Sequence, residues 1–239
     1  MMVERISFGD IEIAVTRKAV KHVHLAVHPP RGRVTLVAPT ATRLDAVRAY
    51  AVSRLGWIRT QRAKLQGQAR ESRRQYVTRE THYLWGRRYL LRVEERDAKP
   101  TVKLEHRRIV LGVRPGASVA QREAVMHAWH KAQLHASLPV LIERWAATLG
   151  VAVNGYHLQR MKTRWGSCNR DAGTIRLNTE LAKKPKDLVE SVVVHELVHL
   201  IEPTHSERFV EVLQRHYPAW REARAELNEL PLGAADWNC

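Results

Sequence analysis

Several residue types and patterns are scarce in this sequence. Only two of its 239 residues are cysteines, Cys168 and Cys239, and neither belongs to a C-x-x-C pair. This scarcity excludes a disulfide framework and a zinc ribbon, and it favours a reducing, cytosolic compartment. The sequence also lacks internal repeats, long apolar runs and the apolar core of a signal peptide. We therefore expect a soluble cytoplasmic protein that has no contact with a membrane.

Acidic residues are few in comparison with basic ones. Lys and Arg number 40 against 24 Asp and Glu, which gives a formal net charge of +16. The excess lies mostly in residues 1–100, where 21 basic residues face 9 acidic ones, whereas residues 101–239 hold 19 against 15. A field of this sign favours non-specific contact with polyanions such as nucleic acid or nucleotides. A basic face that contacts only solvent is the alternative interpretation.

The first part of the chain has the alternation of β-strands. Residues 4–38 predict an antiparallel meander, residues 42–66 a helix, and residues 83–113 further strands. His22, His24 and His28 recur along the middle strand of the meander. Because no carboxylate or cysteine accompanies them, we interpret them as an exposed strand face and not as metal ligands.

The second part is mainly helical. Ser118 is placed to cap an amphipathic helix that runs to about Leu149 and ends at Gly150, and Pro139 predicts a kink or a division within it. We place the domain boundary near residue 115, between the last predicted strand and this helix. We therefore predict an α+β protein with a basic, β-rich domain over 1–115, which includes a helix, and a mainly helical domain with a small β-hairpin over 116–239.

The most informative stretch contains HELVH at residues 195–199. This is the H-E-x-x-H pattern of zinc hydrolases. On a helix, His195 and His199 lie about 40° apart and one turn along the same face, so both imidazoles can bind one ion. Glu196 lies on the same rim, where a general base for a metal-bound water is needed. The surrounding residues are apolar, and buried histidines and a buried glutamate require a partner such as a metal.

A hydrolytic zinc site needs a third protein ligand and one open position. His205 is our choice, because Pro203 ends the helix near Ile201 and lets the chain fold back towards the ion. Carboxylates fill this role in other zinc hydrolases, so Glu202, Glu207 and Glu211 remain as alternatives.

A hairpin is predicted next to this helix. Residues 160–169 lead through an Asp-Ala-Gly turn into the alternating strand 174–181. If that strand is a sheet edge over the cleft, it can pair with an extended peptide. Cys168 lies in the hairpin, and we interpret it as a packed small residue, because a fourth ligand would close the zinc site.

Three segments carry a resemblance to a known family. RMKTRWGSC, IRLNTEL and VVVHELVHLIEPTHSERF resemble the YgjP-like metallopeptidases, which are related to the SprT-like and WLM zinc peptidases. The resemblance covers essentially the whole chain. It implies a β-rich N-terminal region and a zincin-type C-terminal domain with one zinc ion on His195, His199 and His205, and with Glu196 as the catalytic residue.

The function that we expect is metal-assisted hydrolysis of peptide or protein substrates. Zinc lowers the pKa of a bound water, Glu196 accepts its proton, and the hydroxide attacks a polarised carbonyl. Candidate oxyanion donors are His157, Arg164 and Tyr217.

Two other functions remain open. The same metal chemistry acts on phosphorus in a nucleoside triphosphate (pyro)phosphohydrolase, and the resemblance also links the family with that activity. Lys162, Arg164 and Arg176 would then hold the phosphates. A nucleic-acid-associated protein with a structural zinc is the third possibility, although a closed structural site has no need of Glu196.

Overall fold

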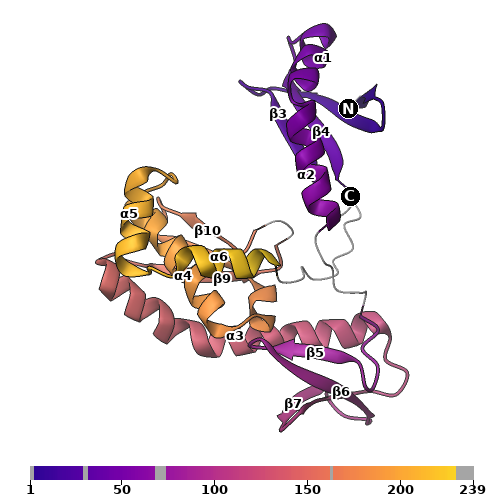
Figure 1. The fold of residues 1–239 in the computed structure, drawn as a ribbon. Coiled ribbons are helices and arrows are strands. Elements are labelled where there is room, and N and C mark those ends of the chain that lie inside the picture. The colour runs from indigo at the N-terminus through magenta and orange to yellow at the C-terminus, as the bar shows by residue number, and fades with distance from the viewer. Residues whose placement is uncertain (1–2, 29–31, 68–73, 162–163, 230–239) are drawn as a thin grey trace. The chain divides into compact units, whose positions relative to one another are not determined.

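The structure is a computed structural model that describes residues 3–28, 32–67, 74–161 and 164–229 (Figure 1). It has the mixed α+β composition that the sequence predicts. The elements form two compact units, one with β1 to β4, α1 and α2, and the other with β5 to α6. The sequence predicted a boundary near residue 115, whereas the division of the chain into these units falls after residue 69. None of the described helices has the length and apolar character needed to cross a membrane.

The first unit is built on a four-stranded sheet in the order β1-β2-β4-β3. The outer pairs are antiparallel, but the inner strands β2 and β4 run parallel. The predicted antiparallel meander is therefore wrong, because β3 crosses to the far side of β4 and becomes an edge strand. The strands are β1 (Val3–Phe8), β2 (Ile11–Lys18), β3 (His24–His28) and β4 (Arg33–Pro39).

The histidines of the first unit lie on this edge. His24 and His28 begin and end β3, while His22 precedes the strand. Nε2 of His28 lies 2.6 Å from the hydroxyl of Thr35 on β4. His22 and His24 are exposed, as the interpretation of an exposed strand face requires, whereas His28 is partly buried, and the strand is at the edge of the sheet and not in its middle.

Two helices cover the first sheet where the sequence predicted one. They are α1 (Leu44–Ser53) and α2 (Leu55–Gly67). Arg54 interrupts them with φ −106° and ψ 1°, and its amide donates to Ala51 in a tight last turn. Val47, Ala51 and Ile58 are nevertheless fully buried against the sheet, so the apolar pattern that suggested a single helix persists across the break.

The second unit begins with a sheet that repeats this topology. Its order is β5-β6-β8-β7, again with antiparallel outer pairs and a parallel inner pair. A helix follows in both cases. The sequence shows no repeat because the two sheets share a strand order and pairing directions without sharing residues. The strands are β5 (Thr81–Leu84), β6 (Arg87–Glu95), β7 (Thr101–Glu105) and β8 (Arg108–Val113).

The long helix α3 (Val119–Leu149) connects this sheet to the rest of the unit. Ser118 and Gln121 form the reciprocal capping box at its start, and Gly150 closes it with φ 66°. Both predicted ends are confirmed. The predicted division at Pro139 is wrong, because the helix runs through this residue as one element (Figure 1).

The tip of the β5–β6 hairpin attaches the second sheet to the segment before α4 (Lys186–Ile201). The amides of Trp85 and Gly86 donate to the carbonyls of Ala182 and Lys183, at 2.9 and 3.2 Å. Gly86 has φ +76°, and a Cβ there would lie 2.7 Å from Cγ of Pro185. Only glycine therefore allows this approach without displacing the start of α4.

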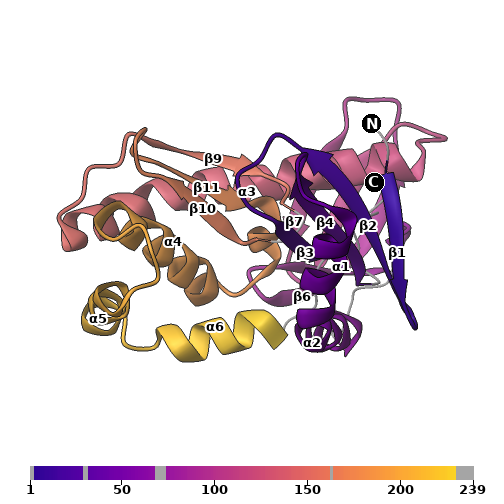
Figure 2. The same ribbon diagram turned by 90° about the horizontal axis from the view of Figure 1, so that it is seen from above.

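A third, small sheet lies beside α4. Its strands are β9 (Gly155–Gln159), β10 (Gly166–Asn169) and β11 (Thr174–Asn178). The predicted hairpin is present as β10 and β11, but β9 pairs in parallel with the other side of β11. The strand that the sequence placed at the edge is therefore central, and β10 is the edge strand nearest α4 (Figure 2).

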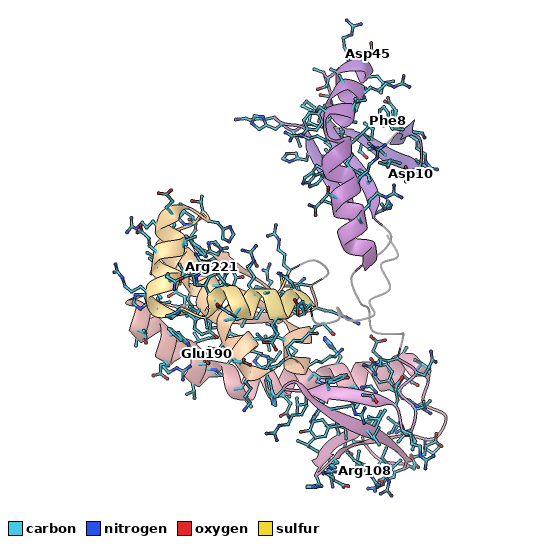
Figure 3. The ribbon with its side chains drawn as sticks, in the orientation of Figure 1. Phe8, Asp10, Asp45, Arg108, Glu190 and Arg221 are labelled. Carbon is cyan, nitrogen blue, oxygen red and sulfur yellow. The ribbon has the colours of Figure 1, made fainter. Side chains whose placement is uncertain are left out.

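Helix α4 is the centre of the second unit's core. Val193, Leu197 and their neighbours pack on α3 and the small sheet, whereas Val194 and Val198 pack on α5 (Glu207–His216). Glu190 of α4 accepts hydrogen bonds from Trp145 and Arg144 of α3 (Figure 3). A last helix, α6 (Trp220–Glu229), buries Ala223 and Leu227 in the same core. The helix that bears HELVH is thus held on all of its apolar sides.

Candidate functional site

The H-E-x-x-H segment lies in the last two turns of α4 and presents one polar face. Glu196 is buried, while His195 and His199 are partly exposed one turn apart. Their rings lie 5.0 Å apart at an interplanar angle of 84°. The strongly apolar remainder of α4 fixes the helix in the core, so the two imidazoles share a rigid frame.

The helix ends where the sequence predicts. Ile201 is its last residue, and Glu202 has extended dihedral angles, φ −130° and ψ 109°, as expected before Pro203. The Glu202 carboxylate accepts hydrogen bonds from the amide and the hydroxyl of Thr204, at 3.2 and 2.8 Å. These bonds tighten the turn that follows the helix.

That turn brings His205 to the histidines of α4. The ligand atoms of His195, His199 and His205, which we call the site group, all lie within 4.8 Å of one another. Nε2 of His205 is 3.1 Å from Nε2 of His195. Two nitrogens bound to one tetrahedral zinc lie about 3.3 Å apart, as follows from zinc–nitrogen distances of about 2.0–2.1 Å. The spacing therefore fits a shared ion.

A hydrogen bond orients one imidazole of the site group. Nδ1 of His199 lies 3.2 Å from the backbone carbonyl of Glu202. Because a carbonyl only accepts, Nδ1 carries the proton, and the lone pair of Nε2 is free for a cation. Such a bond on the far nitrogen is typical of metal-binding histidines.

Phe209 of α5 forms an apolar floor beneath the site group. Its ring centroid lies 5.0, 4.6 and 4.8 Å from those of His195, His199 and His205. The side chain is 2% exposed. Ser206 caps α5 by accepting a hydrogen bond from the backbone amide of Phe209 at 3.3 Å. Neutral imidazoles are favoured in such surroundings, and burial lowers the pKa of His195 to about 4, with the neighbouring histidines adding to the shift.

The alternative carboxylate ligands do not join the site group. Glu202 directs its carboxylate to Thr204, as described above. Glu207 and Glu211 are exposed on α5, and neither belongs to the described residues whose ligand atoms converge with the histidines.

Glu196 lies against the edge strand β10. A Cβ on Gly166 would lie 2.5 Å from Oε1 of Glu196 and 2.6 Å from its Cγ. Glycine is therefore needed for the glutamate to occupy this position. Burial raises the pKa of Glu196 to about 8, and the charge of Arg164 opposes the shift. A carboxyl group in such a setting has the raised basicity that proton transfer near neutral pH requires.

Asn178 holds the loop that leads into β10. Its amide group donates to the carbonyls of Met161 and Arg164, both at 2.9 Å, and its oxygen accepts from the amides of Glu180 at 3.1 Å and Met161 at 3.3 Å. The backbone amide of Asn178 also donates to Trp165 at 2.8 Å. This buried side chain uses its full hydrogen-bonding capacity and so determines where the wall of the site lies.

A cleft of about 600 Å³ opens over the site group, with β10 and the loop before it on one side and α6 on the other. Of the residues predicted from the sequence to bind phosphate or an oxyanion, Arg164 lines this cleft. Arg176, His157 and Tyr217 are not among its lining residues, and the Tyr217 hydroxyl donates to the carbonyl of Asp187. Lys162 lies outside the described residues.

Cys168 lines the cleft from β10 and is partly buried. Burial raises the pKa of its thiol, and the charge of Glu196 raises it further. A thiol with a raised pKa is a poor nucleophile and a poor metal ligand. Its partial packing against the core agrees with the interpretation of a small packed residue.

The sequence did not indicate Gly166, Asn178 or Phe209 as parts of the site. RWGSC was recognised as a motif, yet the reason for its glycine is a contact with a residue 30 positions later. The only available signal was positional, since Asn178 ends the strand paired with that motif and Phe209 lies four positions after the third histidine.

A second group of histidines lies elsewhere in this unit. His82 of β5 and His127 and His130 of α3, which we call the buried group, line a common cavity of about 20 Å³. Nε2 of His82 lies 2.8 Å from the Glu80 carboxylate. Nε2 of His127 lies 3.0 Å from the Thr179 hydroxyl, and Nε2 of His130 lies 3.0 Å from the Tyr83 carbonyl. Each imidazole thus has an oxygen partner of its own.

Comparison with known proteins identifies the family. None of the curated proteins is similar enough to count as a match. Among solved structures, the metallopeptidase zymogen abylysin of Pyrococcus abyssi is 22% identical, with 36% of this chain and 88% of that chain covered and a TM-score of 0.35. The zymogen jannalysin of Methanocaldococcus jannaschii is 19% identical over 36% and 89%, with a TM-score of 0.33. The family model described as "YgjP-like, metallopeptidase domain" matches residues 22–230, so the chain belongs to the YgjP-like metallopeptidase family.

Proposed function

We propose that the protein is a zinc-dependent peptidase in which the site group binds one zinc ion and Glu196 is the general base. The single observation that carries the proposal is the convergence of three imidazoles beside a buried carboxylate. Three nitrogen ligands suit zinc and leave one of four positions open for a reactant. When bound, the metal supplies Lewis-acid activation of water and of a substrate carbonyl.

The protein residues then have separate tasks. Glu196 accepts a proton from the attacking water and returns it to the leaving amine. Gly166 leaves room for the carboxylate at this position, and Phe209 covers the imidazoles on the side that faces α5. Arg164, which lines the cleft and lies near enough to Glu196 to influence its pKa, is the remaining candidate donor for an oxyanion.

The edge strand β10 supports a peptide as the substrate. It pairs with β11 on one side only, and three of its four residues, Gly166, Ser167 and Cys168, line the cleft together with Trp165 before the strand. An extended peptide can therefore add to this edge through main-chain hydrogen bonds and pass over the site group. The central strand β11, which the sequence suggested for this role, already pairs on both sides.

A nucleoside triphosphate is the less favoured substrate. Of the three cations that the sequence proposed for phosphates, Arg164 lines the cleft, Arg176 does not, and Lys162 is outside the described residues. A closed structural zinc site is also less favoured, because Glu196 next to three ligands has no structural task.

The test offers both substrate classes to zinc-loaded protein. We expect hydrolysis of an unstructured casein substrate and no release of phosphate or pyrophosphate from nucleoside triphosphates. Glu196→Gln should retain zinc by elemental analysis and lose about 100- to 10,000-fold in rate, as is typical for removal of a general base. Full activity of Glu196→Gln would exclude the mechanism, and hydrolysis of nucleotides alone would exclude the substrate class.

We also propose that the first unit contacts polyanions. Each carboxylate in its described residues forms an ion pair with an arginine, as in Arg5–Glu12, Arg17–Glu4, Arg43–Asp45 and Arg62–Asp10. Further cations, Lys18, Lys21, Arg33, Arg48, Arg54 and Arg59, have no carboxylate partner among the residues described. Duplex DNA binding that weakens steeply between low and physiological salt would support the proposal, and a flat response would argue against it.

A further inference from the structure

The cleft over the site group is lined by charges of one sign. Arg164, Arg170 and Arg224 line it, whereas Glu196 is the only carboxylate among its described lining residues. Glu196 is 5% exposed and contributes little negative surface. The three arginines are all exposed. A substrate that enters the cleft therefore meets a concave surface with a positive field.

The arginines come from three places around the site group. Arg164 lies two residues before β10, and Arg170 directly follows that strand. Arg224 lies on α6, which also lines the cleft. The positive charge thus surrounds the centre and is not gathered at one point.

Some other arginines of the unit are held in ion pairs. Arg160 pairs with Glu123 at 2.8 Å, and Arg122 pairs with Glu95 at 3.4 Å. Within the described part of the chain, the three cleft arginines form no ion pair and no hydrogen bond. Guanidinium groups that are left unpaired in a concave site are suited to carboxylates of a ligand.

We propose that the cleft selects peptide segments with acidic side chains close to the bond that is cleaved. This inference rests on the proposed peptidase function and names its substrate class. An extended segment along β10 passes Arg164 at one end of the strand and Arg170 at the other, and it faces Arg224 across the cleft. Basic segments are disfavoured, because they add positive charge to a site that already holds the metal and three arginines.

Separate carboxylates fit this arrangement better than one phosphate chain. A phosphate group is bound tightly when several donors converge on it. Here the arginines come from the two ends of β10 and from α6, so the three lie at separate places along the cleft. An extended acidic peptide brings carboxylates to such separate places along its length.

The first experiment maps cleavage without assuming a sequence. Zinc-loaded protein digests a library of peptides from a denatured proteome, and mass spectrometry identifies the cleaved bonds. We expect Asp and Glu to be enriched within three residues of these bonds and Lys and Arg to be depleted. The enrichment should weaken at high salt, because exposed charges are screened. No enrichment of acidic residues would overturn the inference.

Single variants then assign the preference to the arginines. Arg170→Gln and Arg224→Gln should each lower kcat/KM for an acidic peptide by about three- to fivefold, the effect of one exposed charge pair. The matched peptide with Asn and Gln in place of Asp and Glu should be cleaved equally by all variants. Arg176→Gln is the control, because Arg176 is exposed on the adjacent strand β11 but does not line the cleft. An equal loss in Arg176→Gln would overturn the assignment to the cleft.

A binding measurement separates this inference from the proposed function. Fluorescence anisotropy of the labelled acidic and neutral peptides is measured with the zinc-loaded Glu196→Gln protein, which does not need to turn over. The inference predicts that this protein binds the acidic peptide more tightly than the neutral one, and that the difference disappears when Arg170→Gln and Arg224→Gln are added. Such a result supports the inference even if the wild type cleaves no peptide. Equal binding of both peptides overturns it. Absence of cleavage by the wild type counts against the peptidase function alone.

Discussion

The site group and the buried group each contain three histidines of the same unit, and they differ in what the imidazoles face. In the site group, Nε2 of His195 faces Nε2 of His205 at 3.1 Å. In the buried group, the Nε2 atoms of His82, His127 and His130 each face a protein oxygen. Nitrogens that face one another without an oxygen partner are suited to a cation, whereas nitrogens with their own acceptors are already satisfied.

Burial alone does not distinguish the two groups. It lowers the pKa of His195 to about 4 in the site group and that of His130 to about 4 in the buried group. Both groups therefore contain neutral imidazoles near pH 7. The two groups therefore differ in the hydrogen-bond partners of their imidazoles and not in how strongly burial lowers the pKa.

The strongest test of this comparison removes one histidine from each group. His199→Ala should reduce the zinc content from about one ion per chain to almost none and lower peptidase activity by at least about 1,000-fold, because two ligands hold the ion poorly and no longer orient it. His127→Ala, the matched change in the buried group, should retain the metal. Elemental analysis after gel filtration and a casein assay measure both quantities. Equal zinc contents in the two variants would contradict the distinction.

The next test displaces the general base Glu196 and leaves the three histidine ligands unchanged. Gly166→Ala forces Oε1 of Glu196 away from a Cβ that would lie 2.5 Å from it. We expect kcat to fall by about 100-fold, the effect of a displacement of about 1 Å, with an unchanged zinc content. Gly116→Ala is a poor control because its φ is +72°. Gly56→Ala, in a helix with open space around its Cα, is the suitable one, and its activity should match the wild type.

The sequence predicted the site group better than its surroundings. His195 and His199 follow from helical periodicity, and the position of His205 follows from the local effect of Pro203 on the chain. These are short-range relations that one segment contains. The contact between Gly166 and Glu196 depends instead on packing between β10 and α4, and no pattern within either segment encodes it.

The pairing of the strands was likewise not predictable from the sequence. Alternation predicted β2, β3 and β4 but not the first strand β1 as a separate element. It could not show that β2 and β4 pair in parallel, since the apolar pattern of a strand is the same in either direction of pairing. The repeated topology of the two four-stranded sheets was invisible for this reason. In the same way, the edge position of β10 depends on β9, which lies outside the predicted hairpin.

A smaller effect is expected from acid on the buried group. The pKa of His130 in the folded protein is about 4, because burial lowers it most and the charges of Lys183 and His82 lower it further. The hydrogen bond with the Tyr83 carbonyl and the charge of Glu180 raise the pKa, but by less. Below about pH 6.5 the unfolded imidazole binds a proton that the folded one does not, so stability is lost as the pH falls from about 6.5 towards 4. At pH 5 the loss is about 2 kcal/mol.

Replacement of the imidazole should remove this loss. His130→Gln retains a donor for the carbonyl partner but cannot be protonated. Urea unfolding at pH 7 and pH 5, both with saturating zinc, should therefore show a smaller decrease in the free energy of unfolding for the variant than for the wild type. Identical decreases would show that the imidazole does not resist protonation in the folded protein.

The smallest expected effect concerns Thr204, which does not belong to the site group but holds the turn that orients His199. The carbonyl that accepts from Nδ1 of His199 belongs to Glu202, and Thr204 holds the carboxylate of the same residue through two hydrogen bonds. Thr204→Val removes the hydroxyl and retains the shape, so the turn loosens while the three imidazoles remain. Zinc affinity, measured by competition with a chromophoric chelator, should weaken by about tenfold, the lower end of the range for groups that orient a ligand. Thr148→Val, at a surface hydroxyl that donates within α3, should leave the affinity unchanged. If both variants bound zinc as the wild type does, the turn after α4 would have no part in orienting His199, and the site group would depend on the helix and Phe209 alone.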